Sequence, residues 1–102
     1  AVQNNITEIP KEYKLYQNYP NPFNPVTTIK FDIPAMKGKT GLVKLDVFDL
    51  LGKKISSLVN ENLTSGSYSV NFDASSLATG AYIYRLSVNN EVIATKKMLM
   101  IK

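Results

Sequence analysis

The chain has no cysteine and no histidine among its 102 residues. Without cysteine it can form neither a disulfide framework nor a thiolate metal site. Without histidine it lacks the side chain that most often acts as an acid or base near neutral pH and as a metal ligand. A Ser-His-Asp or Cys-His nucleophile cannot be assembled either. We therefore expect a protein that is not an enzyme and that holds no metal or cofactor.

Arginine is scarce as well. Arg85 is the one arginine among twelve basic residues, and eight acidic residues leave a net charge of +4. The lysines are spread along the chain apart from Lys53–Lys54 and Lys96–Lys97. Because base contacts and bidentate phosphate contacts favour arginine, we do not expect nucleic-acid binding. No run of about 18 apolar residues is present, so we expect no membrane span.

The length predicts one domain with one core, and we expect a monomer. The first residue is Ala1, and no methionine or apolar leader precedes the domain, which indicates a piece of a longer or processed protein. Residues 1–12 are polar, show no periodicity and contain Pro10, so we interpret them as a linker or arm. The domain itself is expected to cover residues 13–102.

Apolar and polar residues alternate through most of residues 13–102. In the stretch 27–33, Ile29, Phe31 and Ile33 fall on one face, which is typical of a half-buried strand. Comparable stretches predict further strands at 42–48, 53–60, 67–72, 80–88 and 91–102. About seven strands at this spacing predict an all-β fold, a seven-stranded antiparallel immunoglobulin-like β-sandwich.

Turn residues separate the expected strands. The sequence "DLLG", Asp49–Gly52, predicts a hairpin turn with a bulge, and Asn89–Asn90 predicts a two-residue turn. In "DASSLATGAY", Asp73 is placed to cap a short turn. Gly80 and Tyr82 follow in the pattern of a tyrosine corner, in which the hydroxyl bonds back across the connection between the two sheets.

The stretch "YPNPFNP" places Pro20, Pro22 and Pro25 within six residues, just before a strand. Each proline fixes its own φ and restricts the preceding residue, so the segment is stiff. A segment that cannot donate hydrogen bonds also protects a sheet edge from pairing with another chain. We expect it to close the sandwich and to leave an exposed ribbon that a partner could recognise.

The last expected strand is "TKKMLMIK". We expect its apolar residues, Met98–Ile101, to pack on the core and the strand to lie at a sheet edge with free backbone groups. Lys96, Lys97 and Lys102 should stay in water, because burying an unpaired charge is costly. A partner could add a strand at this edge and read the lysines for specificity.

Two groups of residues allow a chemical interpretation. Asp32, Asp46 and Asp49 are the best-placed carboxylates, but no calcium-loop motif accompanies them, and solvated charges are the favoured interpretation. The aromatic residues near the start of the domain could stack on sugar rings or plug the end of the sandwich, and the second interpretation is favoured. They are Tyr13, Tyr16, Tyr19 and Phe23.

Four blocks in order carry a family resemblance. They are "LYQNYPNPFNPVTTIKFDIP", "VKLDVFDLLGKKISSLVN", "GSYSVNFDASSLATGAYIYRLSV" and "TKKMLMIK". Together they closely resemble the type A C-terminal sorting domain of the type IX secretion system, a family related to the immunoglobulin-like domain of flagellar hook-capping proteins. The match covers roughly residues 13–102. One small departure is Val26, where the family often has threonine.

The resemblance implies the C-terminal domain of a secreted protein that reaches the cell surface through the periplasm. It implies an outer-membrane secretion translocon, a sortase-type surface protease and an N-terminal cargo domain as partners. We expect the translocon to recognise the stiff ribbon and the terminal lysines: Pro20, Asn21, Pro22, Lys96, Lys97 and Lys102. The alternatives are a carbohydrate-binding module or a structural immunoglobulin-like module of a secreted hydrolase.

Overall fold

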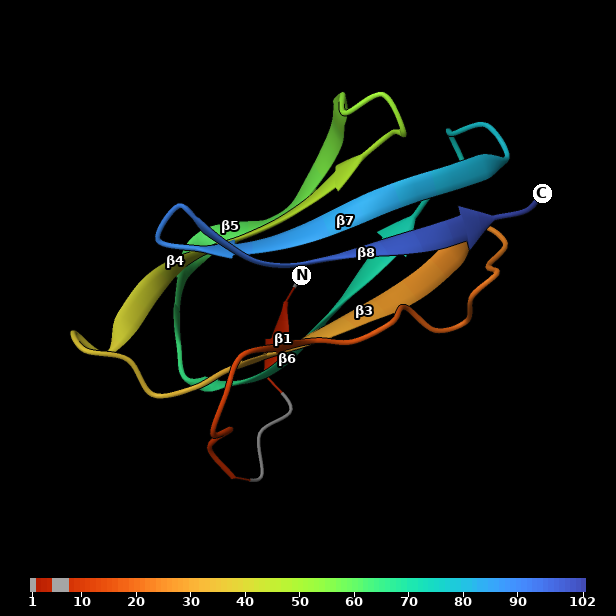
Figure 1. Cartoon of the computed structure of the whole chain (residues 1–102). Helices are drawn as coiled ribbons and strands as arrows, with labels where there is room; N and C mark the ends of the chain where they lie inside the picture. The colour runs from red at the N-terminus through yellow and green to blue at the C-terminus, as the bar shows by residue number, and fades with distance from the viewer. Residues whose placement is uncertain (1, 5–7) are drawn as a thin grey trace.

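The computed structural model describes residues 2–4 and 8–102, and Figure 1 shows the course of the chain. The described residues contain eight strands and no helix, and therefore no helix that could cross a membrane. The strands are β1 (Gln3–Asn4), β2 (Lys14–Leu15), β3 (Val26–Ile33), β4 (Thr40–Phe48), β5 (Lys54–Thr64), β6 (Gly66–Asp73), β7 (Gly80–Val88) and β8 (Glu91–Met100).

The all-β prediction is confirmed, but the predicted number of seven strands is wrong. β1 and β2 have only two residues each. A strand of that length cannot show alternation, and it is defined only by the strand beside which it lies. Two residues of the segment 1–12, Gln3 and Asn4, therefore belong to a sheet, because they pair with Ser69 and Tyr68 of β6.

The strands form two four-stranded antiparallel sheets that pack face to face (Figure 1). Sheet A has the order β1-β6-β3-β2, and sheet B has the order β5-β4-β7-β8. β7 is central in sheet B, as its apolar character on both faces predicts. β5 and β8 are the outer strands of sheet B, so the prediction that the last strand lies at an edge is confirmed.

The core lies between the sheets and is built by the predicted alternation. In β3, Ile29, Phe31 and Ile33 are fully buried, whereas Lys30 between them is exposed. The rings of Phe31 and Tyr68 stack across the β3–β6 pair with their centroids 5.5 Å apart. This apolar layer is what fixes the register of the sheets, since a shift of one residue would turn each buried side chain into water.

The two predicted turns are confirmed. At the β4–β5 turn, Asp49 pairs with Lys53 through the backbone, and its carboxylate accepts the N–H groups of Leu51 and Lys53, each at 2.9 Å. Gly52 closes this turn with a φ of 88°. At the β7–β8 turn, Asn89 and Asn90 both have positive φ, which two-residue hairpin turns of this kind require.

Candidate functional site

The proline-rich stretch and the last strand lie side by side, although about 80 residues separate them in sequence (Figure 1). The N–H of Phe23 donates to the carbonyl of Leu99 at 3.0 Å, and the N–H of Ile101 donates to the carbonyl of Phe23 at 2.9 Å. The N–H of Leu99 donates to Oδ1 of Asn21 at 3.0 Å. We call residues 17–23 together with residues 97–102 the terminal seam.

The terminal seam corrects the prediction of a free edge at the end of β8. The outward backbone groups of Leu99 and Ile101 are bonded to Asn21 and Phe23, and the carbonyl of Lys97 accepts a hydrogen bond from Gln17 Nε2 at 2.7 Å. The two prolines of the seam, Pro20 and Pro22, have no N–H groups and could not cover the edge by themselves. The intervening asparagine and phenylalanine supply the donors and acceptors that proline lacks.

Of the four apolar residues that were predicted to pack on the core at the end of the chain, only two are buried. Met98 and Met100 are buried, but Leu99 is 40 % exposed and Ile101 is 45 % exposed. The reason is the period of two along a strand, which sends alternate side chains to opposite faces of the sheet. Leu99 and Ile101 therefore add apolar surface to the outside of the terminal seam, where a partner can reach it.

A buried polar network anchors the seam to both sheets. Asn18, which is 2 % exposed, donates its N–H to the Tyr84 hydroxyl in β7 at 2.8 Å and its Nδ2 to Thr27 Oγ1 in β3 at 3.0 Å. The Tyr84 hydroxyl in turn donates to the carbonyl of Tyr16 at 2.8 Å. Burial raises the pKa of Tyr84 to about 12. Sequence reasoning missed this network because Asn18, Thr27 and Tyr84 form no motif.

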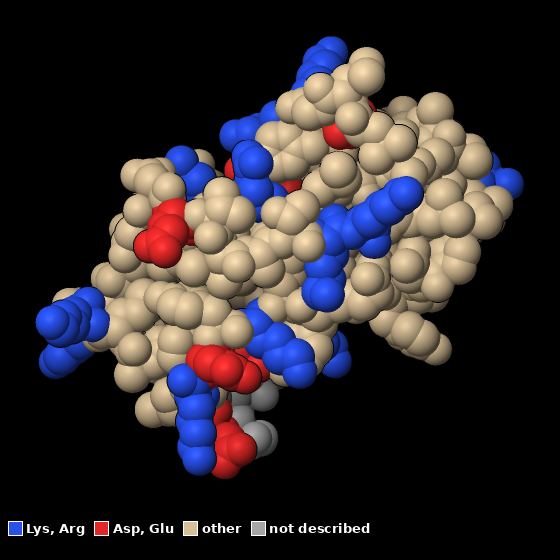
Figure 2. All heavy atoms as spheres, in the orientation of Figure 1, with Lys and Arg blue, Asp and Glu red and all other residues tan. Residues whose placement is uncertain are grey.

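The structure brings most of the predicted recognition residues together. The proline-rich segment of the seam exposes Pro20, Asn21 and Pro22, and the C-terminal segment exposes Lys97 and Lys102. Lys96 is half-buried. Basic side chains elsewhere stand in several separate groups on the face that Figure 2 shows. The peptide bonds that precede Pro20, Pro22 and Pro25 are cis.

The aromatic residues near the start of the domain do not act as one group. Phe23 belongs to the core, and Tyr13 packs against the core from the outside. Tyr16 donates its hydroxyl to Asp32 Oδ2 at 2.6 Å, and this hydrogen bond, with a contribution from burial, raises the pKa of Tyr16. Tyr19 is 82 % exposed. A hollow of about 370 Å³ is lined by Tyr16, Gln17, Tyr19, Thr28 and Lys30.

The turn between β6 and β7 has the bonds of a corner. Oδ1 of Asp73 accepts the N–H of Ser75 at 2.9 Å, and hydrogen bonding from Ser75 lowers the pKa of Asp73. The Tyr82 hydroxyl donates to the carbonyl of Ala78, four residues upstream, at 2.6 Å. Gly80 is the first residue of β7 and pairs with Met100. These residues shape the connection between the sheets, and Thr79 beside them accepts the N–H of Lys102 in the seam at 3.1 Å.

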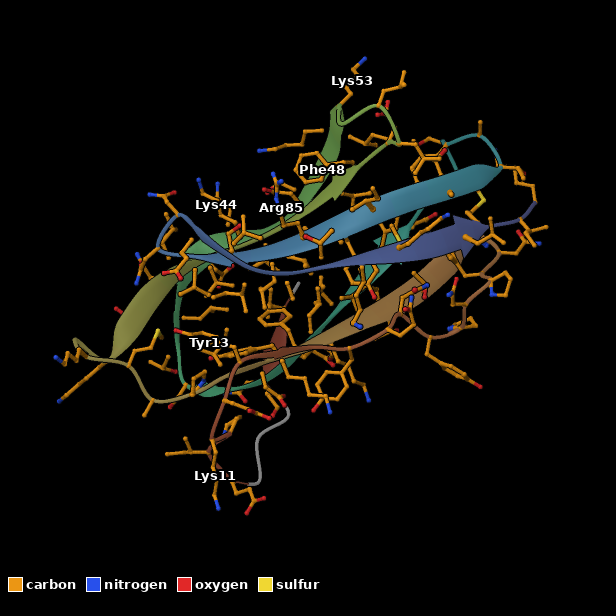
Figure 3. All side chains as sticks on the ribbon, viewed as in Figure 1. Lys11, Tyr13, Lys44, Phe48, Lys53 and Arg85 are labelled. Carbon is orange, nitrogen blue, oxygen red and sulfur yellow. The ribbon has the colours of Figure 1, made fainter. Side chains whose placement is uncertain are left out.

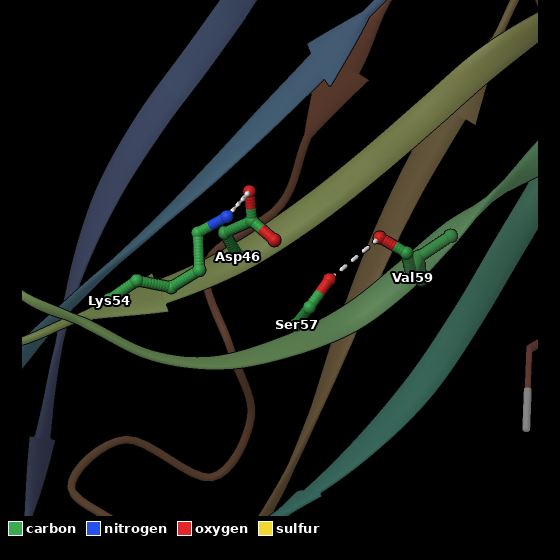
Figure 4. A network of polar contacts seen from close by, with 4 residues as sticks. All are labelled: Asp46, Lys54, Ser57 and Val59. Carbon is green, nitrogen blue, oxygen red and sulfur yellow. Dashed lines mark hydrogen bonds and ion pairs between the residues drawn. The ribbon is translucent and has the colours of Figure 1, made fainter.

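The prediction that Asp46 is a solvated charge is wrong. Asp46 is only 6 % exposed, although it points away from the core. Its Oδ2 lies 3.6 Å from Nζ of Lys54, and its Oδ1 has no hydrogen-bond partner (Figure 4). On the same outer face of sheet B, the guanidinium carbon Cζ of Arg85 lies 4.3 Å from the centroid of the Phe48 ring (Figure 3). Lys54 of β5 and Arg85 of β7 are thus neighbours of the carboxylate, and the aliphatic parts of such long side chains can shield it from water.

The described residues contain no cluster of three or more acidic side chains that could hold a metal ion. Asp32 is engaged by Tyr16, and Asp49 is engaged by its own turn. The three carboxylates named from the sequence therefore lie in three different local settings. None of them faces a second carboxylate across a cleft, which metal binding or paired acid–base chemistry would need.

Comparison with known families gave a match over most of the chain. The model of the secretion system C-terminal sorting domain matches residues 17–102, a range that begins at the first residue of the terminal seam. Neither the curated proteins nor the solved structures gave a match. The chain therefore belongs to the family of secretion system C-terminal sorting domains, the sorting signals of type IX secretion.

Proposed function

We propose that this domain is the address by which an N-terminal cargo is directed from the periplasm through the outer-membrane translocon to the cell surface. Residues 13–102 form the address, and residues 1–12 link it to the cargo and contain the site that a sortase-type surface protease cuts, outside Gln3–Asn4, which are paired with β6. The fold is proposed to be immunoglobulin-like, with the Tyr82 corner as support. The domain has no catalytic role of its own in this scheme.

The observation that carries the proposal is the terminal seam. It places an exposed, stiff ribbon beside exposed lysines, and both are held by hydrogen bonds of 2.7–3.1 Å. A receptor that binds this surface reads two segments at once, and it meets them in this arrangement only in the folded domain. Rigid presentation favours binding because little conformational entropy is lost when the partner docks.

The test is export of a reporter fused to residues 1–102 in a host that has this secretion system. The fusion should reach the cell surface. Replacing Lys97 and Lys102 by alanine should reduce export without changing the melting temperature, since each surface change shifts stability by about 0.5 kcal/mol or less. A matched control replaces the exposed Lys37 and Lys53, which lie outside the seam.

If the seam variant is exported as efficiently as the control variant, the two lysines are not part of the address. Export of both variants at the wild-type level would then direct attention to Pro20–Pro22. A fusion that never leaves the cell, although it is folded, would contradict the sorting function itself.

A carbohydrate-binding function is the second candidate, and one observation favours it. The exposed ring of Tyr19 stands at the hollow that Tyr16 and Lys30 also line, and aromatic rings beside polar groups suit sugar rings. The test is retention on insoluble polysaccharide. Retention that disappears in a Tyr19→Ala variant would support binding, and equal retention of both proteins would exclude Tyr19 as the contact.

A further inference from the structure

The edges of the two sheets differ in how far they are covered. In sheet A, β1 pairs with the outer side of β6, and β2 pairs with the outer side of β3. In sheet B, the terminal seam covers the end of β8. β5 pairs with β4 on one side and with no described strand on the other along all of its 11 residues. An uncovered edge is where another chain can add a strand.

The first half of β5 is protected in another way. Register shifts in the β4–β5 pair leave Ile55 and Leu58 without partners, so both are bulged residues. Figure 4 shows the region of the second bulge, where Ser57 contacts the carbonyl of Val59. Bulges twist an edge and disfavour pairing. From Val59 to Thr64 the pairing with β4 is regular, and the three residues 60–62 are exposed.

The bonds of β4 show which backbone groups of β5 face outward. Asn89, just after β7, donates its N–H to the carbonyl of Leu42 at 2.9 Å and accepts the N–H of Leu42 on its Oδ1. The backbone of Leu42 therefore faces β7. Because directions alternate along a strand, Val43 faces β5 and Lys44 faces β7. The residues of β5 opposite these three are, in the same order, Asn62, Glu61 and Asn60.

It follows that Glu61 is bonded to β4, whereas the backbone N–H and C=O groups of Asn60 and Asn62 point away from the sheet. These are the groups that an added antiparallel or parallel strand would use. The comparable open part of β8, Glu91–Lys96, is interrupted by a register shift at Ile93 and is less regular. Val59–Thr64 of β5 is thus an uncovered edge that pairs regularly with its neighbouring strand.

We propose that the edge Val59–Thr64 of β5 pairs with an extended polypeptide strand of the secretion machinery. The inference rests on the proposed sorting function and adds a second contact, separate from the terminal seam. Glu61 is the one charged residue of this edge, so a partner strand with lysine or arginine beside it fits best. A second copy of this chain fits less well, because antiparallel self-pairing centred on Glu61 would set the two glutamates opposite each other.

The experiment replaces Asn60 and Asn62 by proline in the reporter fusion, with replacement of both by alanine as the matched control. Both variants lose the same side-chain amides, but only proline removes the outward N–H donors, and neither position donates to β4. Proline is tolerated at edge positions whose N–H faces solvent. We expect export of the folded proline variant to fall by about tenfold or more relative to the alanine variant.

Each result decides the matter. Equal export of the folded proline and alanine variants, whether both are normal or both are low, would overturn the inference, because the backbone donors would then not matter. A wild-type fusion that is not exported would overturn the proposed function and this inference with it. Loss in the seam variant combined with normal export of the proline variant would leave the sorting function standing and reject the β5 contact.

Two further measurements cover the case in which the proline variant does not fold. In the wild-type chain, backbone amide exchange with deuterium should be fast at Asn60 and Asn62 and slow at Glu61, and protection of the two asparagines would refute an open edge. A Glu61→Lys fusion keeps the backbone and reverses the charge. Its export should fall severalfold relative to Glu61→Gln, and equal export of the two would refute a basic partner strand.

Discussion

Replacing Tyr84 by phenylalanine tests whether one hydroxyl holds the terminal seam to the sandwich. The change removes an oxygen atom that accepts the N–H of Asn18 and donates to the carbonyl of Tyr16, both at 2.8 Å. Tyr84 is fully buried and Asn18 nearly so, and water cannot easily replace the lost partner of the Asn18 amide. A buried polar group left without a partner costs about 1–3 kcal/mol, and the Tyr16 carbonyl adds a smaller cost because it lies nearer to solvent. We expect the free energy of unfolding to fall by about 2–4 kcal/mol.

The same atom can be removed at two other tyrosines, which makes a matched series. The Tyr82 hydroxyl makes one bond, to Ala78, so Tyr82→Phe should cost about 1–2 kcal/mol. Tyr19 is exposed, so Tyr19→Phe should stay within about 0.5 kcal/mol of wild type. Urea unfolding followed by circular dichroism gives all three values, and 1 kcal/mol corresponds to a shift of about 4–8 °C in melting temperature. A Tyr84→Phe value equal to that of Tyr19→Phe, with unchanged denaturant dependence, would refute the anchoring role.

Three further results are expected. Burial raises the pKa of Tyr84 from 10.0 to about 12, so the folded state holds this proton more tightly than the unfolded state. The free energy of unfolding should therefore keep its full value below pH 10 and decline towards pH 12. In unfolding experiments across this range, the free energy of unfolding of Tyr84→Phe should decline less than that of the wild type. Gly52 has a φ of 88° with open space around it, so Gly52→Ala should cost about 1–2 kcal/mol through the backbone alone, and an unchanged melting temperature would contradict the turn. Phe23→Ala should cost about 3–5 kcal/mol because the ring is buried, and a loss below 1 kcal/mol in urea unfolding would place Phe23 outside the core.

The parts of the fold that follow from local patterns could be predicted from the sequence. Alternation placed Ile29, Phe31 and Ile33 in the core, because a half-buried strand repeats every two residues. Asn89 and Asn90 indicated their turn because few other residues tolerate positive φ. In each case the information lies within a few positions of the residue concerned.

The parts that depend on distant segments could not be predicted. Nothing near Leu99 in sequence indicates that Asn21 will bind its amide, and the bond that Asn18 makes to Tyr84 spans 66 positions. Asp46 was misjudged for the same reason. Alternation does place Asp46 on the outer face, but its burial depends on neighbours from other strands, Lys54 of β5 and Arg85 of β7.

The terminal seam also bears on the kinetics of folding. Its hydrogen bonds join residues 78 and 80 positions apart, and contacts of such high sequence separation require a long loop to close, which costs chain entropy and slows folding. During synthesis, the hydrogen bonds of the seam cannot form until Leu99 has been added to the chain. The surface that contains Pro20–Pro22 is therefore complete only when nearly all of these 102 residues are present. A chain cut short before Leu99 would leave Phe23 without its backbone partners, and it would present an incomplete surface to any receptor that checks it.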